Sequence, residues 1–574
     1  MKSIGRFLKK YRVQCVCAPL FKMLEASFEL LVPLVIAAII DTGIPNGDKG
    51  FIAGMCGVLL ALAAVGFLSA VTAQWFSAKA ATGFGVDVRR ALFGKLQSLS
   101  YSDMDTLGTS VMITRMTSDV NQVQTAVNMF LRLFLRSPFV VFGAMTMAYT
   151  IDWHCALIFT VIIALLCIVV FGIMILNMPL LRGVQRALEQ VLGTTREALS
   201  GARVIRAFNK EETQYAEFTQ KNEALTARQK RSGRLSGLMN PLTYVMINLA
   251  IAYLIYSGAV RVSLGALSQG QVVALYNYMS QILVELIKLV NTILLVNKGM
   301  VCWKRIDDVL EMKPAMAADG KTVPGSPDEA VRFEHVSFRY ANAGGDSLTD
   351  IDFTALKGQT IGVIGGTGSG KTSVVNLIPR FYDAARGSVR VFGEDVKSLD
   401  LEKLRARIGV VPQKAVLFKG TIRDNLRWGD PAATDAMIEQ AVDAAQAADV
   451  VAAKGGLDAM IEQEGRNLSG GQRQRLTIAR ALVRRPDILI LDDSASALDQ
   501  ATDLKLREAL KTLDYHPTVF IVSQRAASVR RADRILVLDD GCLAGQGTHE
   551  ELMETCPVYR EIYESQYGKE AAEA

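Results

Sequence analysis

Long apolar stretches dominate the chain before about residue 300, and they restrict its possible folds more than any other feature does. Each stretch holds about 20 residues or more, which matches the thickness of a bilayer and exceeds the length of an ordinary core helix. Half of all residues are hydrophobic, and the excess lies in this part of the chain. The sequence therefore predicts about six membrane-spanning helices, near residues 14–42, 51–78, 127–150, 153–178, 239–262 and 270–298.

Charged residues around the first apolar stretch predict its orientation. The stretch contains Glu25 and Glu29, is longer than the apolar part of a signal peptide and has no small-residue cleavage site, so we interpret it as a retained helix. The loop over residues 41–50 has Lys49 as its one basic residue, whereas five basic residues and no acidic one precede the stretch: Lys2, Arg6, Lys9, Lys10 and Arg12. We therefore expect a multi-pass protein of the inner or plasma membrane whose N-terminus and second half are cytoplasmic. The net charge of +6 follows the same bias and gives no reason to predict nucleic-acid binding.

Loop lengths predict how the chain is divided. The outer loops are short, whereas the inner segments 79–126 and 179–238 are long, polar and poor in Pro and Gly, so we expect the helices to continue into the cytoplasm. A segment with Pro and Gly, near residues 313–327, is predicted to be a linker to a second domain. The predicted domains are a transmembrane domain over residues 1–312, a linker over 313–330 and a nucleotide-binding domain over 331–574.

Beyond residue 331, short β-rich runs alternate with helical patterns, which is typical of an α/β sheet. An apolar strand over residues 361–364 leads into a glycine-rich loop, and a helical pattern follows. A strand, such a loop and a helix in this order are the context of a phosphate-binding loop. We expect ATP to be bound here by Gly365, Gly366, Thr367, Gly368, Ser369, Gly370, Lys371, Thr372 and Ser373.

The residue types in this loop suit MgATP. Glycines allow the tight turn in which backbone N–H groups converge on a phosphate. Lys371 is expected to bridge the β- and γ-phosphates, and the Thr372 hydroxyl to bind Mg²⁺. Asp492 ends a fully apolar run over residues 488–491, where a lone buried carboxylate is costly unless it has a function. We therefore predict that Asp492 is a second Mg²⁺ ligand.

Four further motifs accompany these residues: Phe338-Arg339-Tyr340, Val411-Pro412-Gln413, Leu468-Ser469-Gly470-Gly471-Gln472 and Ser496-Ala497-Leu498-Asp499. With them, the second half resembles the cassettes of ABC transporters. This resemblance implies a RecA-like core with a helical subdomain, in which Tyr340 stacks on adenine and Gln413 of the Q-loop reaches the Mg²⁺ and the attacking water. It also implies that residues 496–499 form the D-loop and that the signature contacts the γ-phosphate of a partner cassette. The signature residues are Ser469, Gly470, Gly471 and Gln472.

The first half is similar to the six-helix exporter type of the same family. Its residues 107–119 resemble that family's first cytoplasmic loop, and residues 203–208 resemble the second. The resemblance implies coupling helices near residues 101–104 and 208–215, and two cassettes that close head to tail around two ATP molecules. One copy of this chain is then half of a transporter.

Two positions depart from the family pattern. Asp493 stands where such cassettes carry a catalytic Glu, and Gln524 stands where they carry a switch His. Together with an intact signature, both changes resemble the degenerate half of heterodimeric bacterial multidrug exporters. The expected partner is a second half-transporter with a complete Walker B Glu and switch His. The alternative is a slow homodimeric exporter in which Asp493 acts as the base.

Ionisable residues inside the spans are candidates for substrate contacts. They come in sets of two, one helical turn apart. The alternative is structural: Glu285 and Lys288 can pair with each other along one helix face, and Arg132 can extend toward the membrane interface. We expect a hydrophobic or amphipathic small molecule, or membrane lipid, as substrate, and an ATP-gated channel or regulatory subunit stays an alternative. The membrane spans exclude a soluble cassette ATPase, and importers carry cassette and spans on separate chains. The pairs are Glu25 with Glu29, Arg132 with Arg136, and Glu285 with Lys288.

Overall fold

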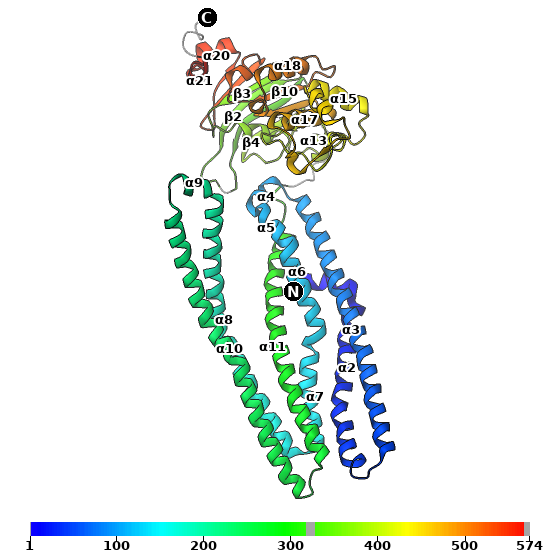
Figure 1. Ribbon diagram of the computed structural model, residues 1–574. Coiled ribbons are helices and arrows are strands. Elements are labelled where there is room, and N and C mark those ends of the chain that lie inside the picture. Colours follow the sequence, from blue (N-terminus) through cyan, green and yellow to red (C-terminus); the bar gives the residue numbers. More distant parts are fainter. Residues whose placement is uncertain (1, 317–327, 342, 568–574) are drawn as a thin grey trace. The chain divides into compact units, whose positions relative to one another are not determined.

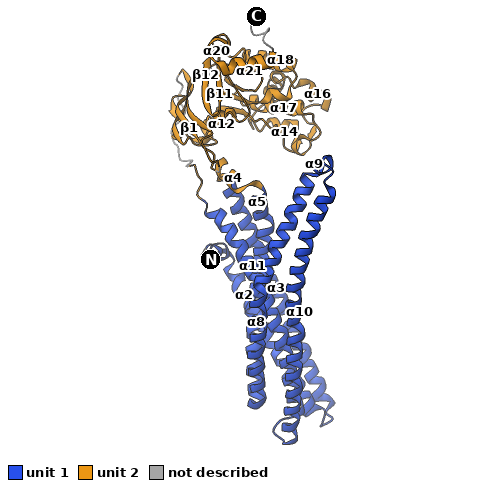
Figure 2. Ribbon diagram, turned by 90° about the vertical axis from the view of Figure 1, so that its left-hand side faces the viewer, with its two compact units in different colours: residues 1–97, 110–312 blue, residues 98–109, 313–574 orange. Residues whose placement is uncertain are grey.

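The computed structural model describes residues 2–316, 328–341 and 343–567. The chain forms two compact units (Figure 2). One contains residues 1–97 and 110–312, and the other contains residues 98–109 and 313–574. The break after Met312 coincides with the predicted start of the linker, but most of the predicted linker, residues 317–327, lies outside the described residues.

The first unit is entirely helical, and the prediction of six membrane spans is confirmed (Figure 1). Three of its helices have 48 to 53 residues. At a rise of about 1.5 Å per residue, such helices are about 75 Å long, far more than a bilayer needs. The six span-bearing segments are Ser3–Gly43, Lys49–Ser98, Thr109–Ile151, Trp153–Ser200, Glu211–Ser263 and Gln269–Glu311.

Several of these segments contain short helical pieces. The regular helices are α1 (Lys2–Leu8), α2 (Arg12–Ala38), α3 (Lys49–Ser98), α5 (Thr109–Thr114), α6 (Val120–Met129), α7 (Arg136–Ile151), α8 (Trp153–Ser200), α10 (Glu211–Ser263) and α11 (Gln269–Glu311). Between them lie η1 (Lys9–Tyr11), η2 (Ile39–Gly43), η3 (Arg115–Asp119) and η4 (Phe130–Phe134).

Polar contacts fix the turns between the long helices. Asp152 caps α8 by accepting a hydrogen bond from the Cys155 N–H at 2.9 Å, and it pairs with Arg261 of α10 at 2.6 Å. Asp41 accepts the Gly270 N–H at 2.7 Å, which ties the end of the first span to the start of α11. A capped and paired turn satisfies backbone groups that are otherwise left open at helix ends.

Two short helices follow the long ones on the predicted inner side. The first is α4 (Tyr101–Leu107), at the predicted position. The second is α9 (Ala202–Ala207), so the prediction for residues 208–215 was wrong. The long helix α8 ends at Ser200, with Gly201 as its C-cap, and the acidic first turn of α10 favours a new helix start at Glu211. The residues between them therefore form α9.

The second unit is an α/β domain, as predicted. Its central sheet has the order β12-β11-β3-β10-β9-β6, with β12 as the antiparallel edge. These strands are β3 (Thr360–Gly365), β6 (Ile408–Val411), β9 (Ile488–Asp492), β10 (Thr518–Val522), β11 (Arg534–Asp539) and β12 (Cys542–Gly547). A four-stranded antiparallel sheet contains β1 (Glu329–Phe338), β2 (Leu348–Leu356), β4 (Arg386–Val391) and β5 (Glu394–Asp395), and a small ribbon contains β7 (Gly420–Thr421) and β8 (Met460–Ile461).

Helices cover the central sheet, and each strand contributes to both of its faces. Leu489 and Leu491 of β9 pack into one apolar core, and Ile488 and Ile490 pack into the other. A strand that is buried on both faces reads as a continuous apolar run, as residues 488–491 do. The helices are α12 (Lys371–Leu377), α13 (Leu401–Ala406), α14 (Ile422–Leu426), α15 (Asp435–Ala444), α16 (Ala448–Lys454), α17 (Gly470–Val483), α18 (Gln500–Lys511), α19 (Ala526–Val529), α20 (His549–Thr555) and α21 (Pro557–Tyr567), with η5 (Gln463–Gly465) and η6 (Ser494–Ala497).

The segment with α4 packs within the second unit. The Tyr101 ring lies 4.5 Å from the Phe381 ring, measured between centroids. The Tyr382 hydroxyl donates to Asp105 at 2.7 Å, and the Ala315 N–H donates to Asp103 at 3.1 Å. The α4 segment is therefore held by the residues after α12 and by the chain just beyond α11.

Candidate nucleotide-binding site

Three neighbouring parallel strands bring the predicted site residues to one edge of the central sheet. Strand β10 lies between β3 and β9, and Val522 is in register with Val363 on one side and with Asp492 on the other. The carboxyl ends of parallel strands meet at one edge, which is where open α/β sheets bind ligands. The glycine-rich loop, the predicted switch position and the predicted Walker B carboxylate therefore meet there.

The glycine-rich loop has a backbone that other residues would adopt only under strain. Gly368 and Gly370 have φ values of 86° and 93°. A side chain at Gly365 would collide with the carbonyl oxygen of Leu538 on β11. The loop therefore needs glycine at these positions for its shape.

Lys371 turns back over the loop that precedes it. Its Nζ atom donates to the carbonyl oxygens of Gly365 at 2.9 Å and Gly366 at 2.6 Å. The residue is only 8% exposed, and burial lowers the pKa of its amine, which the nearby carboxylates of Asp493 and Asp492 oppose. The cation thus lies inside the phosphate loop, where a polyanion would compensate its loss of hydration.

The predicted magnesium ligands meet beside it. Thr372 donates from its hydroxyl to Asp492 at 3.0 Å, and Asp492 is 6% exposed. Burial raises the pKa of the Asp492 carboxyl, as expected for an acid that no cation fully neutralises. A hydroxyl and a carboxylate are hard oxygen donors that fit Mg²⁺, which usually keeps waters as its other ligands.

The Q-loop residue Gln413 lies next to the predicted base position. The Gln413 side-chain nitrogen lies 3.4 Å from the Asp493 carboxylate, so the structure groups Gln413 with the predicted base position. Asp493 itself has a left-handed backbone, with φ of 45°, and its N–H donates to the Val522 carbonyl at 3.0 Å. Asp493 directly follows β9, and Gln524 lies two residues beyond the end of the neighbouring strand β10.

Tyr340 belongs to an aromatic cluster next to the loop. Its hydroxyl lies 3.0 Å from the Ser373 hydroxyl, and its ring meets those of Phe338 at 4.6 Å and Tyr382 at 5.2 Å. These contacts fix the Tyr340 ring beside the first turn of α12. Tyr382 was missed from the sequence, and its position directly after Phe381 is the one local signal of an aromatic cluster.

The signature residues form the start of α17. Ser469 and Gln472 make a capping box, in which the Ser469 hydroxyl accepts from the Gln472 N–H at 3.3 Å and the Gln472 amide oxygen accepts from the Ser469 N–H at 2.9 Å. Ser469 and Gly470 are exposed. Among the residues described, no hydrogen bond joins them to the phosphate loop of the same chain, which leaves their helix end open to another molecule.

Comparison with known proteins agrees with this geometry. The ABC transporter transmembrane region matches residues 15–286, and the ABC transporter domain matches residues 348–496. The uncharacterized ABC transporter ATP-binding protein YfiB of Bacillus subtilis is 35% identical over 100% of both chains. The chain belongs to the ABC transporter family. It is thus a multi-pass membrane protein with an ABC ATPase domain, and it serves ATP-driven transport.

Other relatives agree with an exporter subunit. The uncharacterized ABC transporter ATP-binding protein Rv1273c of Mycobacterium tuberculosis is 34% identical over 98% of this chain and 97% of its own. An ATP-dependent lipid A-core flippase of Syntrophus aciditrophicus is 29% identical over 84% of this chain and 80% of its own. The structure of a bacterial Atm1-family ABC exporter with ATP bound has a TM-score of 0.80, with 97% of this chain and 98% of that chain covered, and at 23% identity it shows a shared fold.

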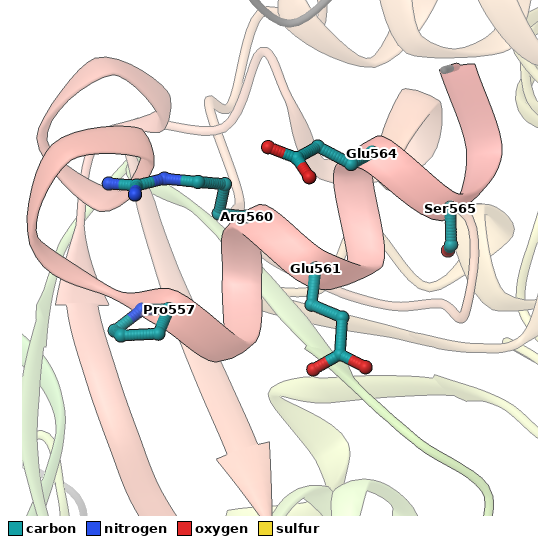
Figure 3. A pocket seen from close by; sticks show the side chains of 5 residues that line it. All are labelled: Pro557, Arg560, Glu561, Glu564 and Ser565. Atoms are coloured by element: carbon teal, nitrogen blue, oxygen red, sulfur yellow. The ribbon is translucent and has the colours of Figure 1, made fainter. Parts of the chain in front are cut away.

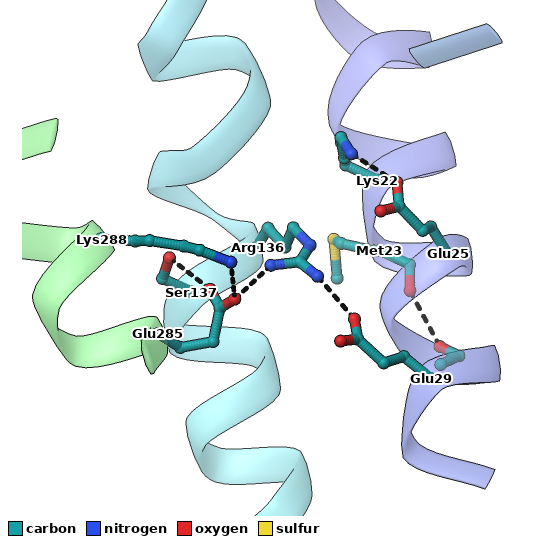
Figure 4. Close-up of polar contacts among 9 residues, drawn as sticks. Lys22, Met23, Glu25, Glu29, Arg136, Ser137, Glu285 and Lys288 are labelled. Carbon is teal, nitrogen blue, oxygen red and sulfur yellow. Dashed lines mark hydrogen bonds and ion pairs between the residues drawn. The ribbon is translucent and has the colours of Figure 1, made fainter. Parts of the chain in front are cut away.

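The charged pairs predicted in the spans of this ABC transporter converge on one arginine (Figure 4). Arg136 of α7 pairs with Glu29 of α2 at 2.5 Å and with Glu285 of α11. Glu285 also accepts from the Ser137 hydroxyl at 2.8 Å and from Lys288 at 2.9 Å. The predicted pairing of Glu285 with Lys288 is present, but Arg136 in addition links three helices.

Two further ionisable residues named from the sequence lie outside this network. Glu25 pairs with Lys22, three residues earlier on the same helix. Arg132 takes part in no ion pair among the described residues. A second feature of these spans is an open groove of about 840 Å³ between α8 and α10, which is lined mainly by aliphatic side chains and also by Tyr253 and Tyr256.

Proposed function

We propose that this chain is the degenerate subunit of a heterodimeric ABC exporter. It binds MgATP at its own site, hydrolyses it slowly, and lends its signature to the hydrolytic site of a partner half-transporter. One observation carries this proposal: Asp493 and Gln524 follow adjacent strands beside an intact phosphate loop. The same chain keeps a capped and exposed signature helix.

The position of Asp493 supports slow hydrolysis at its own site. Its side chain is one methylene shorter than Glu, which withdraws the carboxylate by about 1.5 Å. A general base must lie within hydrogen-bond reach of the attacking water, and its loss costs about 10²–10⁴ in rate. Its φ of 45° and its N–H bond to Val522 hold the backbone, so the chain cannot simply move the shorter side chain forward.

The residue type at position 524 also supports slow hydrolysis at this site. Its amide can donate a hydrogen bond to a γ-phosphate, but it carries no charge and takes up no proton, unlike a histidine. The site can therefore bind and sense ATP without an efficient step of hydrolysis.

The intact signature supports a role in the partner's site. The capping box of Ser469 and Gln472 orients the first N–H groups of α17, which has 14 residues, outward. Because this end makes no described hydrogen bond to its own phosphate loop, it is free to meet a γ-phosphate that another cassette holds. The partner is then a half-transporter with a complete Walker B Glu and switch His.

For the substrate, we propose a hydrophobic or amphipathic molecule, or membrane lipid. The mainly aliphatic groove between α8 and α10 supports an apolar ligand, and one relative is named a lipid A-core flippase. The basic N-terminal residues support a cytoplasmic N-terminus and nucleotide domain in the inner or plasma membrane.

The test is MgATPase activity of the chain co-expressed with candidate partner half-transporters and purified into lipid. Ser469→Ala in this chain should reduce the activity of the complex by about 10-fold or more, whereas Asp493→Asn should leave it nearly unchanged. Thr434→Ala, which removes a similar helix cap at α15, is the matched control for lost capping. A complex that loses its activity with Asp493→Asn would contradict the proposal.

A further inference from the structure

The last described turn of the chain lies against the segment that carries the predicted switch residue. Gln566 of α21 accepts a hydrogen bond from the Ala526 N–H through its side-chain oxygen, at 2.8 Å. Its side-chain nitrogen donates to the Gln524 carbonyl oxygen, also at 2.8 Å. One side-chain amide thus holds two backbone groups that flank Arg525. We call these two contacts the Gln566 clamp.

We propose that Gln566 is a positioning residue of the nucleotide site, which holds the backbone of residues 523–526 so that the Gln524 side chain faces the γ-phosphate. The inference rests on the proposed role of Gln524 as the γ-phosphate contact. It adds a residue that lies 42 positions from Gln524 and in none of the family's motifs. The C-terminal helix is then part of the apparatus that distinguishes ATP from ADP.

The rest of the switch segment is already fixed at its two ends. The Ser523 N–H donates to the Val363 carbonyl on β3 at 3.0 Å. Beyond the segment, Arg507 of α18 donates to the Ala527 carbonyl at 3.0 Å, and an ion pair with Asp503 orients its guanidinium. In the middle, the Arg525 N–H donates to the Ser523 hydroxyl at 3.0 Å, and Gln566 adds the contact to the Gln524 carbonyl. Loss of Gln566 would therefore loosen Gln524 while both ends of the segment stay in place.

The Gln566 clamp can hold the switch segment only if helix α21 is itself fixed in the domain, and its packing shows that it is. Tyr559 and Tyr563 are buried, and the Tyr559 hydroxyl lies 2.8 Å from a ring nitrogen of His549 on α20. The Arg530 guanidinium, just after α19, lies 5.8 Å from the centre of the Tyr563 ring. The helix is therefore anchored both to α20 and to the chain that follows the switch segment.

Other side chains of α21 face a surface hollow (Figure 3). The hollow is lined by Pro557, Arg560, Glu561, Glu564 and Ser565, all from this one helix. Gln566 does not line it and is engaged with the switch segment instead. Ser565 is adjacent in sequence, and its hydroxyl donates within the helix, to the Ile562 carbonyl at 2.8 Å, with no other hydrogen bond to the residues that the structure describes. Ser565→Ala is therefore a matched control.

A neutral switch residue depends on such positioning. A single hydrogen bond weakens steeply when its angle departs from linearity, and Gln524 has no charge that would act over a longer distance. Each net hydrogen bond changes an equilibrium by about 2-fold to 10-fold. The clamp is therefore expected to affect binding of ATP, which has a γ-phosphate, and not binding of ADP.

The test is equilibrium binding of MgATP and of MgADP to the full-length chain in lipid. Gln566→Ala should reduce the preference for ATP over ADP by about 3-fold to 10-fold, with ADP affinity unchanged. Gln566→Glu keeps the shape and the acceptor but loses the donor to Gln524, so it should behave like Gln566→Ala. Ser565→Ala should match the wild type.

Combining variants separates the possible failures. If the clamp acts through Gln524, then adding Gln566→Ala to Gln524→Ala should cause no further loss. Two outcomes would contradict the positioning role of Gln566 and leave the role of Gln524 intact. In one, Gln524→Ala changes the preference for ATP over ADP but Gln566→Ala does not. In the other, Gln566→Ala weakens the binding of ATP and of ADP equally. If Gln524→Ala itself leaves the preference unchanged, the proposed role of Gln524 is wrong and the inference fails with it.

Discussion

At the scale of single residues, the nucleotide site depends on a buried carboxylate and a buried amine that share one edge of the sheet. Asp492 accepts from Thr372, and Lys371 lies within the loop of glycines. Burial shifts the pKa of both groups toward their neutral forms. A bound magnesium ion and a bound phosphate would reverse both tendencies, because each supplies the missing opposite charge.

Asp492→Asn should therefore remove most of the effect of Mg²⁺ on ATP binding. An amide remains an oxygen donor, but it lacks the negative charge that a hard divalent cation prefers. We expect ATP affinity with Mg²⁺ to fall by about 10-fold or more, while affinity in EDTA changes little. Binding of ATP to the full-length chain with and without the metal measures this. Asp487→Asn, at an exposed carboxylate that pairs with Arg407, should change neither value.

The residues of the phosphate loop could be predicted because their mechanism requires fixed types at fixed spacing within a dozen positions. Gln566 and Tyr382 could not, since each acts through a contact with an element far away in the sequence. The grouping of Gln413 with Asp493 also needed the structure, because it depends on how β6 and β9 lie in register.

At the scale of elements, helix α4 belongs to the same compact unit as the nucleotide site. Tyr382 connects the two, because its ring contacts Tyr340 and its hydroxyl donates to Asp105 of α4. Burial raises the pKa of Tyr382, and the Asp105 carboxylate raises it further, so the phenol stays protonated and donates at physiological pH.

Tyr382→Phe should loosen α4 without unfolding the domain. The substitution keeps the ring and removes a hydrogen bond to a charged group, which is worth about 1.5–3 kcal/mol when buried and less at a partly exposed site. Backbone amides in residues 101–107 should exchange with deuterium about 5-fold faster or more. Tyr515→Phe is the control, because the buried Tyr515 hydroxyl has no described hydrogen-bond partner. Unchanged exchange in α4 would mean that the hydroxyl does not hold this helix.

Arg136 connects elements within the membrane-spanning unit. It pairs with carboxylates from α2 and α11, so removing Glu285 leaves a buried cation with one partner. We expect Glu285→Ala to lower the stability of the chain by about 3 kcal/mol. Thermal unfolding in lipid or detergent tests this, with the exposed Glu212→Ala as control. A loss of stability no greater than that of Glu212→Ala would show that the Arg136 network does not stabilise the helices.

The ends of elements were harder to predict than their existence. The apolar runs predicted six spans because bilayer thickness sets a minimum length, and all six are present. The polar segments after the runs predicted that the helices continue beyond the membrane, but not that one of them reaches 53 residues, since polar helix outside the membrane has no length rule. The error at α9 arose in the same way, because a helix break at Gly201 leaves only a weak local signal.

At the scale of the whole molecule, the chain has the ABC transporter fold, with Asp493 and Gln524 beside the phosphate loop. The spans, the cassette and the family are established by sequence and comparison. The division of labour between two unlike subunits is our proposal, and it depends on two residues, Asp493 and Gln524. It requires that the site on Lys371 of this chain contributes little turnover.

The most direct measurement is MgATPase turnover of this chain alone in lipid, compared with Lys371→Ala. We predict that the wild-type chain hydrolyses ATP at a rate close to that of Lys371→Ala. The wild type should nevertheless bind MgATP, and the variant should not. Turnover of about 1 per second or more, abolished by Lys371→Ala, would show that Asp493 serves as an adequate base in a homodimer and would contradict the account.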